Sequence, residues 1–387
     1  MPPAQRHPTL ADVAERAGVS ASTVSRTLRG LSTVSPDVRA RVERAAREMN
    51  FVVSRQASSL VTGKTGVVAA LVPTLNSWFI GSALSSLGPV LRESGLELLV
   101  YVTPDMDERS TFFERLPARR NADALLVFSF DLSEEEGARL DDLNMPVIYI
   151  SQHAEGRPSV YVDDVSGAHR ATRHLLNLGH RRIAFVKTIG ASGFTFSSHE
   201  RLIGYQQALT EAGIAPDDDL VVDTLAGDKR GTVEAIGRLL GLREPPTAIF
   251  AEQDEVAVSV LWTLRRSNID VPERMSVVGF DDHQMAEWSD LTTMAQSPSD
   301  IGRAAADLAL ALINEPDADQ ERHIVLPTRL IPRGSTAPAP ASAAPEQVPL
   351  PRARHASSRR EPGATGEVGE RSSGPDVFPP GLRAPAQ

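Results

Sequence analysis

Apolar residues near the start of the chain recur with the spacing of a helix. One stripe, at positions i, i+3, i+4 and i+7, consists of Leu10, Val13, Ala14 and Ala17. Gly18 suits the left-handed conformation that ends a helix, and Ser20 suits the N-cap of a second one. The pattern therefore predicts two short helices that are joined by a tight turn.

The second helix is expected to place Val24 and Leu28 in a small core. A third helix should begin with Ser35 as N-cap, Pro36 at the first helical position and Asp37 in the first turn. Its apolar stripe is Val38, Val42, Ala45, Ala46 and Met49. Three helices in this order indicate a helix-turn-helix, which places one short helix in the major groove of DNA.

From Gly66 onward the pattern changes to short, continuous apolar runs that alternate with helical segments. These runs are at 66–72, 96–102, 124–128, 147–150, 183–186, 248–250 and 276–280. Strands buried on both faces and alternating with helices predict an α/β fold with parallel sheets. Seven strands are too many for one small sheet and suit two similar lobes.

Composition marks the remaining boundaries. Residues 54–64 are polar around a few apolar positions and predict a short hinge helix or linker between a head at 1–53 and a core at 65–334. Residues 335–387 contain ten of the 28 prolines together with much Ala, Ser and Arg, a composition that cannot bury a core. We expect a disordered tail there.

The net charge of −10 is distributed unevenly along the 387 residues. Residues 1–64 carry ten Lys and Arg against five Asp and Glu, residues 335–387 carry six against five, and residues 65–334 hold a net charge of −16. A basic head on an acidic body is typical of a DNA-binding regulator. The absence of cysteine, of an 18-residue apolar span and of an apolar leader favours a cytoplasmic, nucleoid-associated protein without membrane contact.

Several ordered motifs resemble those of the LacI-type (lactose/galactose repressor) family of bacterial transcription regulators. The head motif runs from Leu10 to Arg26 and includes Asp12, Ala14 and Ala17-Gly-Val-Ser20. The core adds Gly179-His-Arg-Arg-Ile-Ala, Arg201-x-x-Gly-Tyr205, Pro246-Thr-Ala-Ile-Phe, Val277-Val-Gly-Phe-Asp-Asp and Leu291-Thr-Thr293. The resemblance covers about residues 8–334.

The resemblance implies a helix-turn-helix head, a hinge helix and a two-lobed core like type I periplasmic binding proteins. It places the first lobe at about 65–162 plus 294–327, and the second at about 163–293. It also implies a homodimer on a pseudo-palindromic operator in double-stranded DNA. The tail has no leucine heptad, so we expect no larger oligomer.

In the family's motif the groove-facing positions of the second helix match Ala21, Ser22 and Arg26. Arg26 can bind guanine O6 and N7 in a bidentate contact, worth about 1–3 kcal/mol of discrimination. Ser22 can bond a base or a phosphate, and Ala21 can pack on a thymine methyl group. The remaining hydroxyls are candidates for phosphate contacts or helix caps: Thr9, Ser20, Thr23, Ser25 and Ser35.

The hinge matches the family less closely. Ala57 and Leu60 agree with it, but Val53 stands where the family usually has proline and Ser58 where it has arginine. The resemblance implies that the two Leu60 side chains of a dimer enter the minor groove and kink the DNA. Leu60 could equally dock on the core. A helix this short should form only on DNA, when two subunits bring their hinges together.

Candidate effector-binding residues follow the strands of the core, because ligands of open α/β sheets bind at the carboxyl ends of strands. Asn76, Trp78 and Phe79 follow the first strand, and aromatic faces beside polar amides suit sugar rings. Arg201 matches a family arginine that often binds ligand oxygens. The other candidates are Ser151, Lys229, Gln253, Asp254, Asp281 and Gln296.

Three of these candidates have a second interpretation. Ser151 stands where many sugar-binding members carry aspartate, and Lys229 where an aromatic residue is common. A lysine in the cleft favours an acidic or phosphorylated ligand, unless its side chain points to solvent. Asp254 either binds ligand or caps the following helix. Paired aspartates at 163–164 and 281–282 are interpreted as hinge carboxylates, so we expect no metal and no cofactor.

Other classes of protein fit the sequence less well. Gly63-Lys64-Thr65 lacks the upstream glycine of a phosphate-binding loop, and His180 has no evident catalytic partners, so we expect no enzyme. A solute-binding protein, or a DNA-binding protein without effector control, remains the alternative. The sequence favours a repressor whose operator affinity changes when a sugar-like molecule binds between the lobes.

Overall fold

The computed structural model describes residues 8–28, 34–51, 63–189, 195–225, 229–315 and 322–340. The hinge positions Val53, Ala57, Ser58 and Leu60 lie outside these ranges, as does the tail from residue 341. Within the described ranges, no helix has the length and apolar character needed to span a membrane.

The head contains the three expected helices, α1 (Leu10–Ala17), α2 (Ala21–Leu28) and α3 (Pro36–Glu48). Thr9 and Asp12 form a reciprocal capping box at the start of α1, and Gly18 ends that helix with φ of +65°. The three helices are held together by a small apolar core around the fully buried side chains of Val13, Val24 and Val42. The predicted apolar stripes are therefore confirmed.

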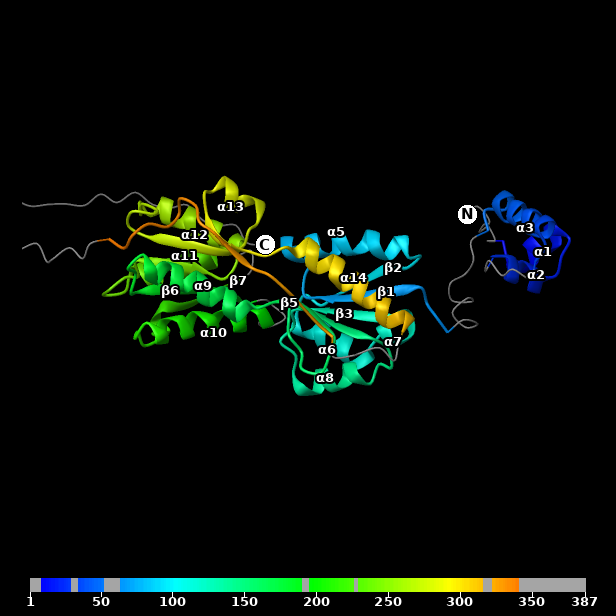
Figure 1. The fold of residues 1–387 in the computed structure, drawn as a ribbon, viewed down its shortest axis with the longest axis horizontal. Helices are drawn as coiled ribbons and strands as arrows, with labels where there is room; N and C mark the ends of the chain where they lie inside the picture. Colours follow the sequence, from blue (N-terminus) through cyan, green and yellow to red (C-terminus); the bar gives the residue numbers. More distant parts are fainter. Residues whose placement is uncertain are drawn as a thin grey trace, which may run out of the picture. The chain divides into compact units, whose positions relative to one another are not determined.

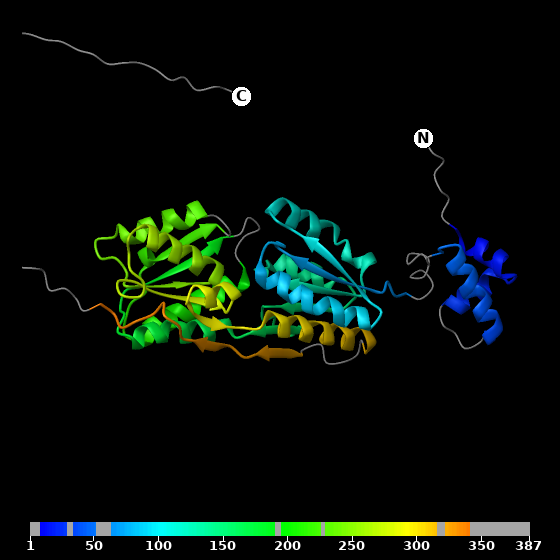
Figure 2. The same ribbon diagram turned by 90° about the horizontal axis from the view of Figure 1, so that it is seen from above.

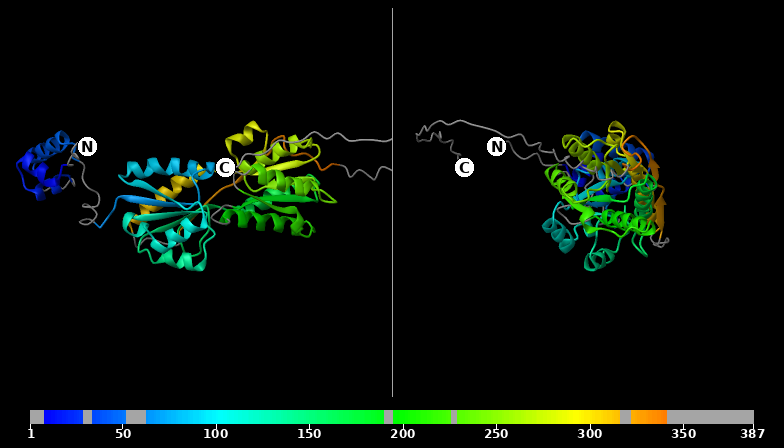
Figure 3. Two further views of the ribbon diagram at one scale, coloured as in Figure 1. Left: turned by 180° about the vertical axis from the view of Figure 1, so that it is seen from behind. Right: turned by 90° about the vertical axis from the view of Figure 1, so that its left-hand side faces the viewer.

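The first lobe is built on a parallel six-stranded sheet with the order β11-β5-β4-β3-β1-β2. Its strands are β1 (Val67–Val72), β2 (Glu97–Val102), β3 (Ala124–Phe128), β4 (Val147–Ile150), β5 (Ser159–Val162) and β11 (His323–Leu326). One face is covered by α5 (Trp78–Glu93) and α14 (Pro298–Asn314). The other face is covered by α6 (Met106–Arg115), α7 (Ala118–Asn121) and α8 (Glu134–Asp141), the teal helices of Figure 3.

The second lobe has a six-stranded sheet with the order β12-β10-β9-β8-β6-β7. Its strands are β6 (Ile183–Ile189), β7 (Val221–Leu225), β8 (Ala248–Ala251), β9 (Ser276–Asp281), β10 (Thr292–Ala295) and the antiparallel β12 (Arg329–Ile331). Helices α9 (Asp164–Asn177) and α10 (Phe196–Glu211) cover one face (Figure 1). Helices α11 (Lys229–Leu240), α12 (Asp254–Arg266) and α13 (Gln284–Trp288) cover the other, and a short 3-10 turn spans Asp218–Leu220.

The chain passes between the lobes three times. It leaves the first lobe after β5, returns after β10 to form α14, and leaves again between β11 and β12, the orange strands of Figure 2. The crossings put β10 and β12 in the second sheet, so the second lobe extends past the expected limit at 293 and includes a segment beyond 327.

The expected start of the tail at residue 335 is wrong by about five residues. The hydroxyl of Ser335 accepts from the Thr292 amide at 2.8 Å and donates to the Val277 carbonyl at 2.6 Å. The amide of Ala339 donates to the Leu178 carbonyl at 2.8 Å. These backbone and hydroxyl bonds attach residues 335–339 to the second lobe, which composition alone could not reveal.

Candidate DNA interface and effector cleft

The second helix of the head presents the predicted face to its surroundings. Ala21, Ser22 and Arg26 are exposed, while Val24 and Thr27 are buried against the head core. One side of α2 therefore packs and the other is available for contacts. This is the arrangement that a recognition helix needs, because its side chains must reach base edges while its opposite side keeps the orientation fixed.

Several predicted hydroxyls act in local capping. The hydroxyl of Ser20 accepts from the Thr23 amide at 3.2 Å and lies 2.9 Å from the hydroxyls of both Ser22 and Thr23. Thr9 accepts from the Asp12 amide. Ser35 is the N-cap of α3, but its side chain makes no capping hydrogen bond. Ser25 is half-buried on α2.

Arg201 is the centre of a buried polar cluster in the second lobe. From α10 its Nε donates to Asp164 Oδ1 at 2.8 Å, and its Nη1 donates to the Glu252 carbonyl at 2.6 Å. The guanidinium lies over the Phe280 ring, 3.7 Å from its centroid, and 3.7 Å from Asp281 Oδ1. Arg201 is thus held from several directions by groups that the fold itself supplies.

Asp281 and Gln296, both candidate effector-binding residues, meet in the same cluster. Gln296 Nε2 donates to Asp281 Oδ1 at 2.7 Å, and both residues are buried. The other amide atom of Gln296, Oε1, is buried and has no hydrogen-bond partner. Asp281 ends β9 with φ of +121°, which is unusual for a residue other than glycine and is the kind of backbone strain that gathers at functional sites. Burial raises the pKa of Asp281 to about 7.

The Asp254 side chain is bonded within the second lobe. The sequence had suggested that it binds ligand or caps α12. Its carboxylate accepts from the His283 amide at 2.8 Å and from the Thr293 hydroxyl at 2.7 Å, and the N-cap of α12 is Gln253. A Cβ at Gly279 would lie 2.1 Å from Asp254 Oδ1, so glycine is what admits this carboxylate. Burial, with the charge of Asp281 next, raises the pKa of Asp254 to about 8.

Two buried carboxylates of this cluster were not among the predicted residues. Glu252 accepts from the Thr188 amide at 2.9 Å and from the Ser198 hydroxyl at 2.5 Å, and Asp164 pairs with Arg201. Burial raises the pKa of both acids. Glu252 follows β8 directly, so the strand-end rule that selected Gln253 could have found it. Asp164 was interpreted only as one of a pair of hinge carboxylates.

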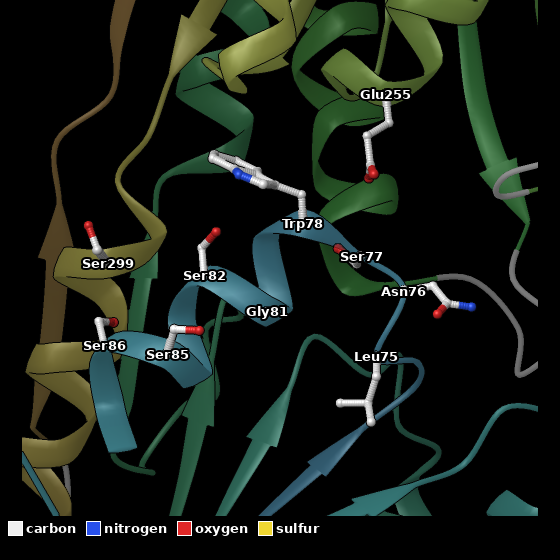
Figure 4. Close-up of a pocket in the computed structure, with 10 residues that line it drawn as sticks. All are labelled: Leu75, Asn76, Ser77, Trp78, Gly81, Ser82, Ser85, Ser86, Glu255 and Ser299. Atoms are coloured by element: carbon white, nitrogen blue, oxygen red, sulfur yellow. The ribbon is translucent and has the colours of Figure 1, made fainter. Parts of the chain in front are cut away.

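Asn76 and Trp78 line a different space from Arg201. They border a pocket of about 680 Å³ that follows the first turns of α5 and also contacts Glu255 and Ser299 (Figure 4). The Trp78 ring packs edge-on against His283 of the second lobe, with centroids 4.6 Å apart. Phe79 packs against the core of the first lobe. The predicted aromatic platform is therefore split between a pocket wall and a core.

The remaining candidates are placed as follows. Ser151 is buried after β4 with φ of +57°, and its carbonyl accepts from the Ser197 hydroxyl at 3.1 Å. Gln253 is half-buried at the start of α12. Lys229 begins α11, and its side chain lies outside the described part of the structure. Within the described residues there is no group of three His, Asp or Glu that could hold a metal ion.

Further contacts join the two lobes between the end of β3 and the start of α10. The Ser129 and Ser197 hydroxyls lie 3.0 Å apart, and Phe130 and Thr195 form an antiparallel bridge. Ser129 and Phe130 follow β3 of the first lobe, while Thr195 and Ser197 begin α10 of the second. The carboxyl ends of the two sheets thus face the space in which a ligand would be enclosed.

Comparisons with known proteins agree with both parts of the chain. A family model described as bacterial regulatory proteins, lacI family, matches residues 9–54, and one described as a periplasmic binding protein-like domain matches residues 172–336. The chain is 32% identical over 337 residues to the HTH-type transcriptional regulator DegA of Bacillus subtilis (strain 168), across 85% of this chain and 98% of the relative.

Solved structures show the same architecture. A transcriptional regulator CelR-cellobiose complex is 30% identical with a TM-score of 0.61, across 85% of this chain and 99% of the other. A Lac repressor dimer bound to operator and the anti-inducer ONPF has a TM-score of 0.75 at 24% identity, across 86% and 100%. The predicted head and two-lobed core are confirmed. The curated relatives are transcriptional regulators rather than enzymes, and the chain belongs to the LacI family of bacterial transcriptional regulators.

Proposed function

We propose that this regulator represses transcription by binding a pseudo-palindromic operator, and that a small sugar-like molecule between its lobes changes its operator affinity. The observation that carries the proposal is the exposed face of α2, with Arg26 one turn after Ser22, on a head whose opposite side is packed. An arginine on such a face can read guanine directly. The protein would act in the cytoplasm, at the nucleoid.

Effector control would act through the contacts between lobes. The Trp78–His283 ring contact and the Ser129–Ser197 hydroxyl pair join the two lobes in the described structure. A ligand that favours one arrangement of the lobes over another shifts the population toward that arrangement by its difference in affinity. A coupling of about 1–3 kcal/mol between ligand and operator is typical of such systems.

We propose a homodimer because the second lobe exposes large apolar side chains on neighbouring helices. Trp262 on α12 is 48% exposed, and Met285 and Trp288 on α13 are 38% and 77% exposed. Large exposed apolar patches on soluble proteins often mark interaction surfaces. A dimer would also supply two heads for the two halves of a palindrome. Sedimentation of the full chain as a monomer or a tetramer would contradict this part of the proposal.

The test separates base recognition from general affinity. Arg26→Ala should reduce binding to the preferred operator by about 5- to 150-fold for each head, the loss of about 1–3 kcal/mol expected for a bidentate guanine contact, while binding to unrelated DNA stays the same. Arg47→Ala, which removes an exposed arginine from the last turn of α3, is the matched control and should leave the preference intact. An Arg26→Ala protein with full preference would refute the assignment of α2.

A further inference from the structure

A short segment after β12 is attached to the second lobe mainly by hydrogen bonds. It comprises residues 335–339, which we call the strap, at the end of the orange part of the chain in Figure 2. Ser335 is buried, while the other four residues are half-buried or exposed and include two alanines and a proline. Since few apolar atoms are buried there, the attachment of the strap depends on the polar partners that the lobe presents.

Two histidines are among these partners. His180 Nε2 lies 3.0 Å from the Ala337 carbonyl oxygen, and its Nδ1 lies 2.9 Å from the Thr247 hydroxyl. His174 Nε2 lies 3.0 Å from the Thr336 hydroxyl. Because a carbonyl oxygen only accepts, Nε2 of His180 carries a hydrogen in this contact. Both rings thus hold the strap through Nε2.

The strap binds at the end of the second sheet that lies away from the cleft. His180 precedes β6, Thr247 precedes β8 and Ser276 begins β9, so all three stand at the amino ends of strands. The hydroxyl of Ser276 accepts from the Ala337 amide at 3.0 Å and donates to the Ala337 carbonyl at 3.2 Å. A change in the strap is therefore separate from ligand contacts at the carboxyl ends of the strands.

A positive charge on either ring would be poorly compensated. Burial lowers the pKa of His180, with the Ala337 carbonyl offsetting part of this effect, and burial together with the charge of His180 lowers the pKa of His174. Within the described residues, the pKa of neither ring is raised by a carboxylate. Two protonated rings would also repel each other, so the attached strap favours neutral histidines.

The charged side chains around this end of the lobe have other partners. Asp290 is nearest to the strap along the fold, and its carboxylate lies against Gly334 rather than against either ring. The basic neighbours are bonded as follows: Arg170 to Thr328, Arg173 to Glu211, Arg181 to the Ala212 carbonyl, Arg182 to the Glu244 carbonyl and Asp217, and Arg333 to Asp282. The two histidines are therefore the groups whose protonation acts on the strap directly.

We propose that the strap is an acid-sensitive clasp: protonation of His174 and His180 releases residues 335–339 while the rest of the second lobe stays folded. Release opens the Nε2 side of both rings to water, where a charged imidazole is hydrated. The chain would then leave the lobe at about Gly334 instead of at Pro340. Acid would thereby lengthen the free C-terminal segment without involving the cleft or the head.

The direction and size of the effect follow from linkage. Below the usual histidine pKa of about 6.5, the released strap leaves rings that bind protons, whereas the attached strap keeps them neutral. Each pH unit then raises the released population by at most about tenfold for one histidine and about a hundredfold for both. Asp254 and Asp281 act in the opposite direction on unfolding of the whole lobe, because their raised pKa values let the folded state keep protons that the unfolded state loses. Acid should therefore loosen the strap and not the core.

Hydrogen–deuterium exchange of the full chain, read by mass spectrometry between pH 5 and pH 7.5, tests the release. Protection is the exchange rate of each peptide compared with the intrinsic rate at the same pH. We expect the protection of residues 335–339 to fall by about tenfold or more between pH 6.5 and pH 5.5, while the amides of β8 and β9 keep theirs.

Glutamine substitutions test whether the histidines are responsible. A glutamine amide can donate where Nε2 does but does not titrate, so the double variant His174→Gln with His180→Gln should show equal strap protection at pH 6.5 and pH 5.5. His199→Gln, an exposed change on α10 of the same lobe, is the matched control and should keep the full pH dependence. If the double variant does not fold, His174→Gln alone should reduce the change to about fivefold.

Three results would overturn the proposal. The first is strap protection that does not change with pH, and the second is a fall that the glutamine variants share, since another group would then be responsible. The third is an equal loss of protection in β8 and β9, because the lobe would then unfold as a whole. Operator recognition is measured separately through Arg26, so neither result decides the other.

Discussion

Removing the positive charge of Arg201 should destabilise the second lobe strongly. Arg201→Met keeps much of the apolar stem over the Phe280 ring but leaves Asp164, at 4% exposure, without its ion-pair partner. Breaking a buried pair by removing one partner costs about 3–5 kcal/mol. For an unfolding unit of about 150–250 residues, each kcal/mol shifts the melting temperature by about 2–4 °C, so we expect a fall of about 10 °C.

The physical cause can be isolated with a second change. Asp164→Asn in the Arg201→Met background removes the unpaired charge and should restore about half of the lost stability or more. The loss should also shrink as the pH falls, because burial raises the pKa of Asp164 and a protonated carboxyl needs no cation. Calorimetry and urea unfolding measure both effects.

A surface pair provides the control for this experiment. Arg303→Met removes the exposed partner of Asp300 on α14 and should cost less than about 1 kcal/mol, because exposed ion pairs contribute little. The reasoning fails if Arg201→Met loses no more stability than Arg303→Met, or if Asp164→Asn gives no recovery.

Three further predictions concern packing, protonation and the start of the tail. Gly302→Ala should destabilise the first lobe by about 1–3 kcal/mol, because its Cβ would lie 2.2 Å from the Ala83 carbonyl oxygen. Gly237→Ala on α11 meets open space and should stabilise the second lobe by about 0.5–1 kcal/mol, and urea unfolding measures both changes. The pKa of Asp254 is about 8 in the folded state and about 3.9 in the unfolded state, so between these pH values only the folded state binds the proton. The free energy of unfolding should therefore fall as the pH rises from about 4 to about 8, and Asp254→Asn should reduce that slope. A chain ending at Pro340 should melt like the full chain, whereas one ending at Gly334 should melt several degrees lower because Ser335 and its two hydrogen bonds are lost; equal melting of the two would contradict the boundary.

The elements that sequence predicted well are those in which local pattern and burial agree. The stripes of the head helices and the central strands are buried on the faces that their periodicity indicated. The strands β5, β7, β10, β11 and β12 were not predicted, since they are only three to five residues long. β7, β11 and β12 are partly exposed edge strands, whereas β5 and β10 are largely buried but contain Ser159, Thr292 and Thr293. Short strands at sheet edges depend on their neighbours, which local pattern does not record.

The polar site was predictable in position but not in detail. The strand-end rule found Asp281, and Gln296 was chosen as part of a crossover between the lobes. Neither argument could tell that Asp254 turns toward His283 and Thr293 while Glu252 joins the cluster. The direction of a side chain depends on which donors the folded neighbours present. Ser335 is a similar case, because its segment has the composition of a tail but its hydroxyl is hydrogen-bonded to the backbone of β9 and β10.

The central claim is that two copies of α2 read a palindrome. It is tested most directly by selecting DNA from a random-sequence library with the full chain and sequencing the bound fraction. The account predicts enrichment of one dyad-symmetric site with half-sites about one helical turn apart, and loss of that enrichment in Arg26→Ala but not in Arg47→Ala. Enrichment of no sequence, or of a site without dyad symmetry, would contradict it.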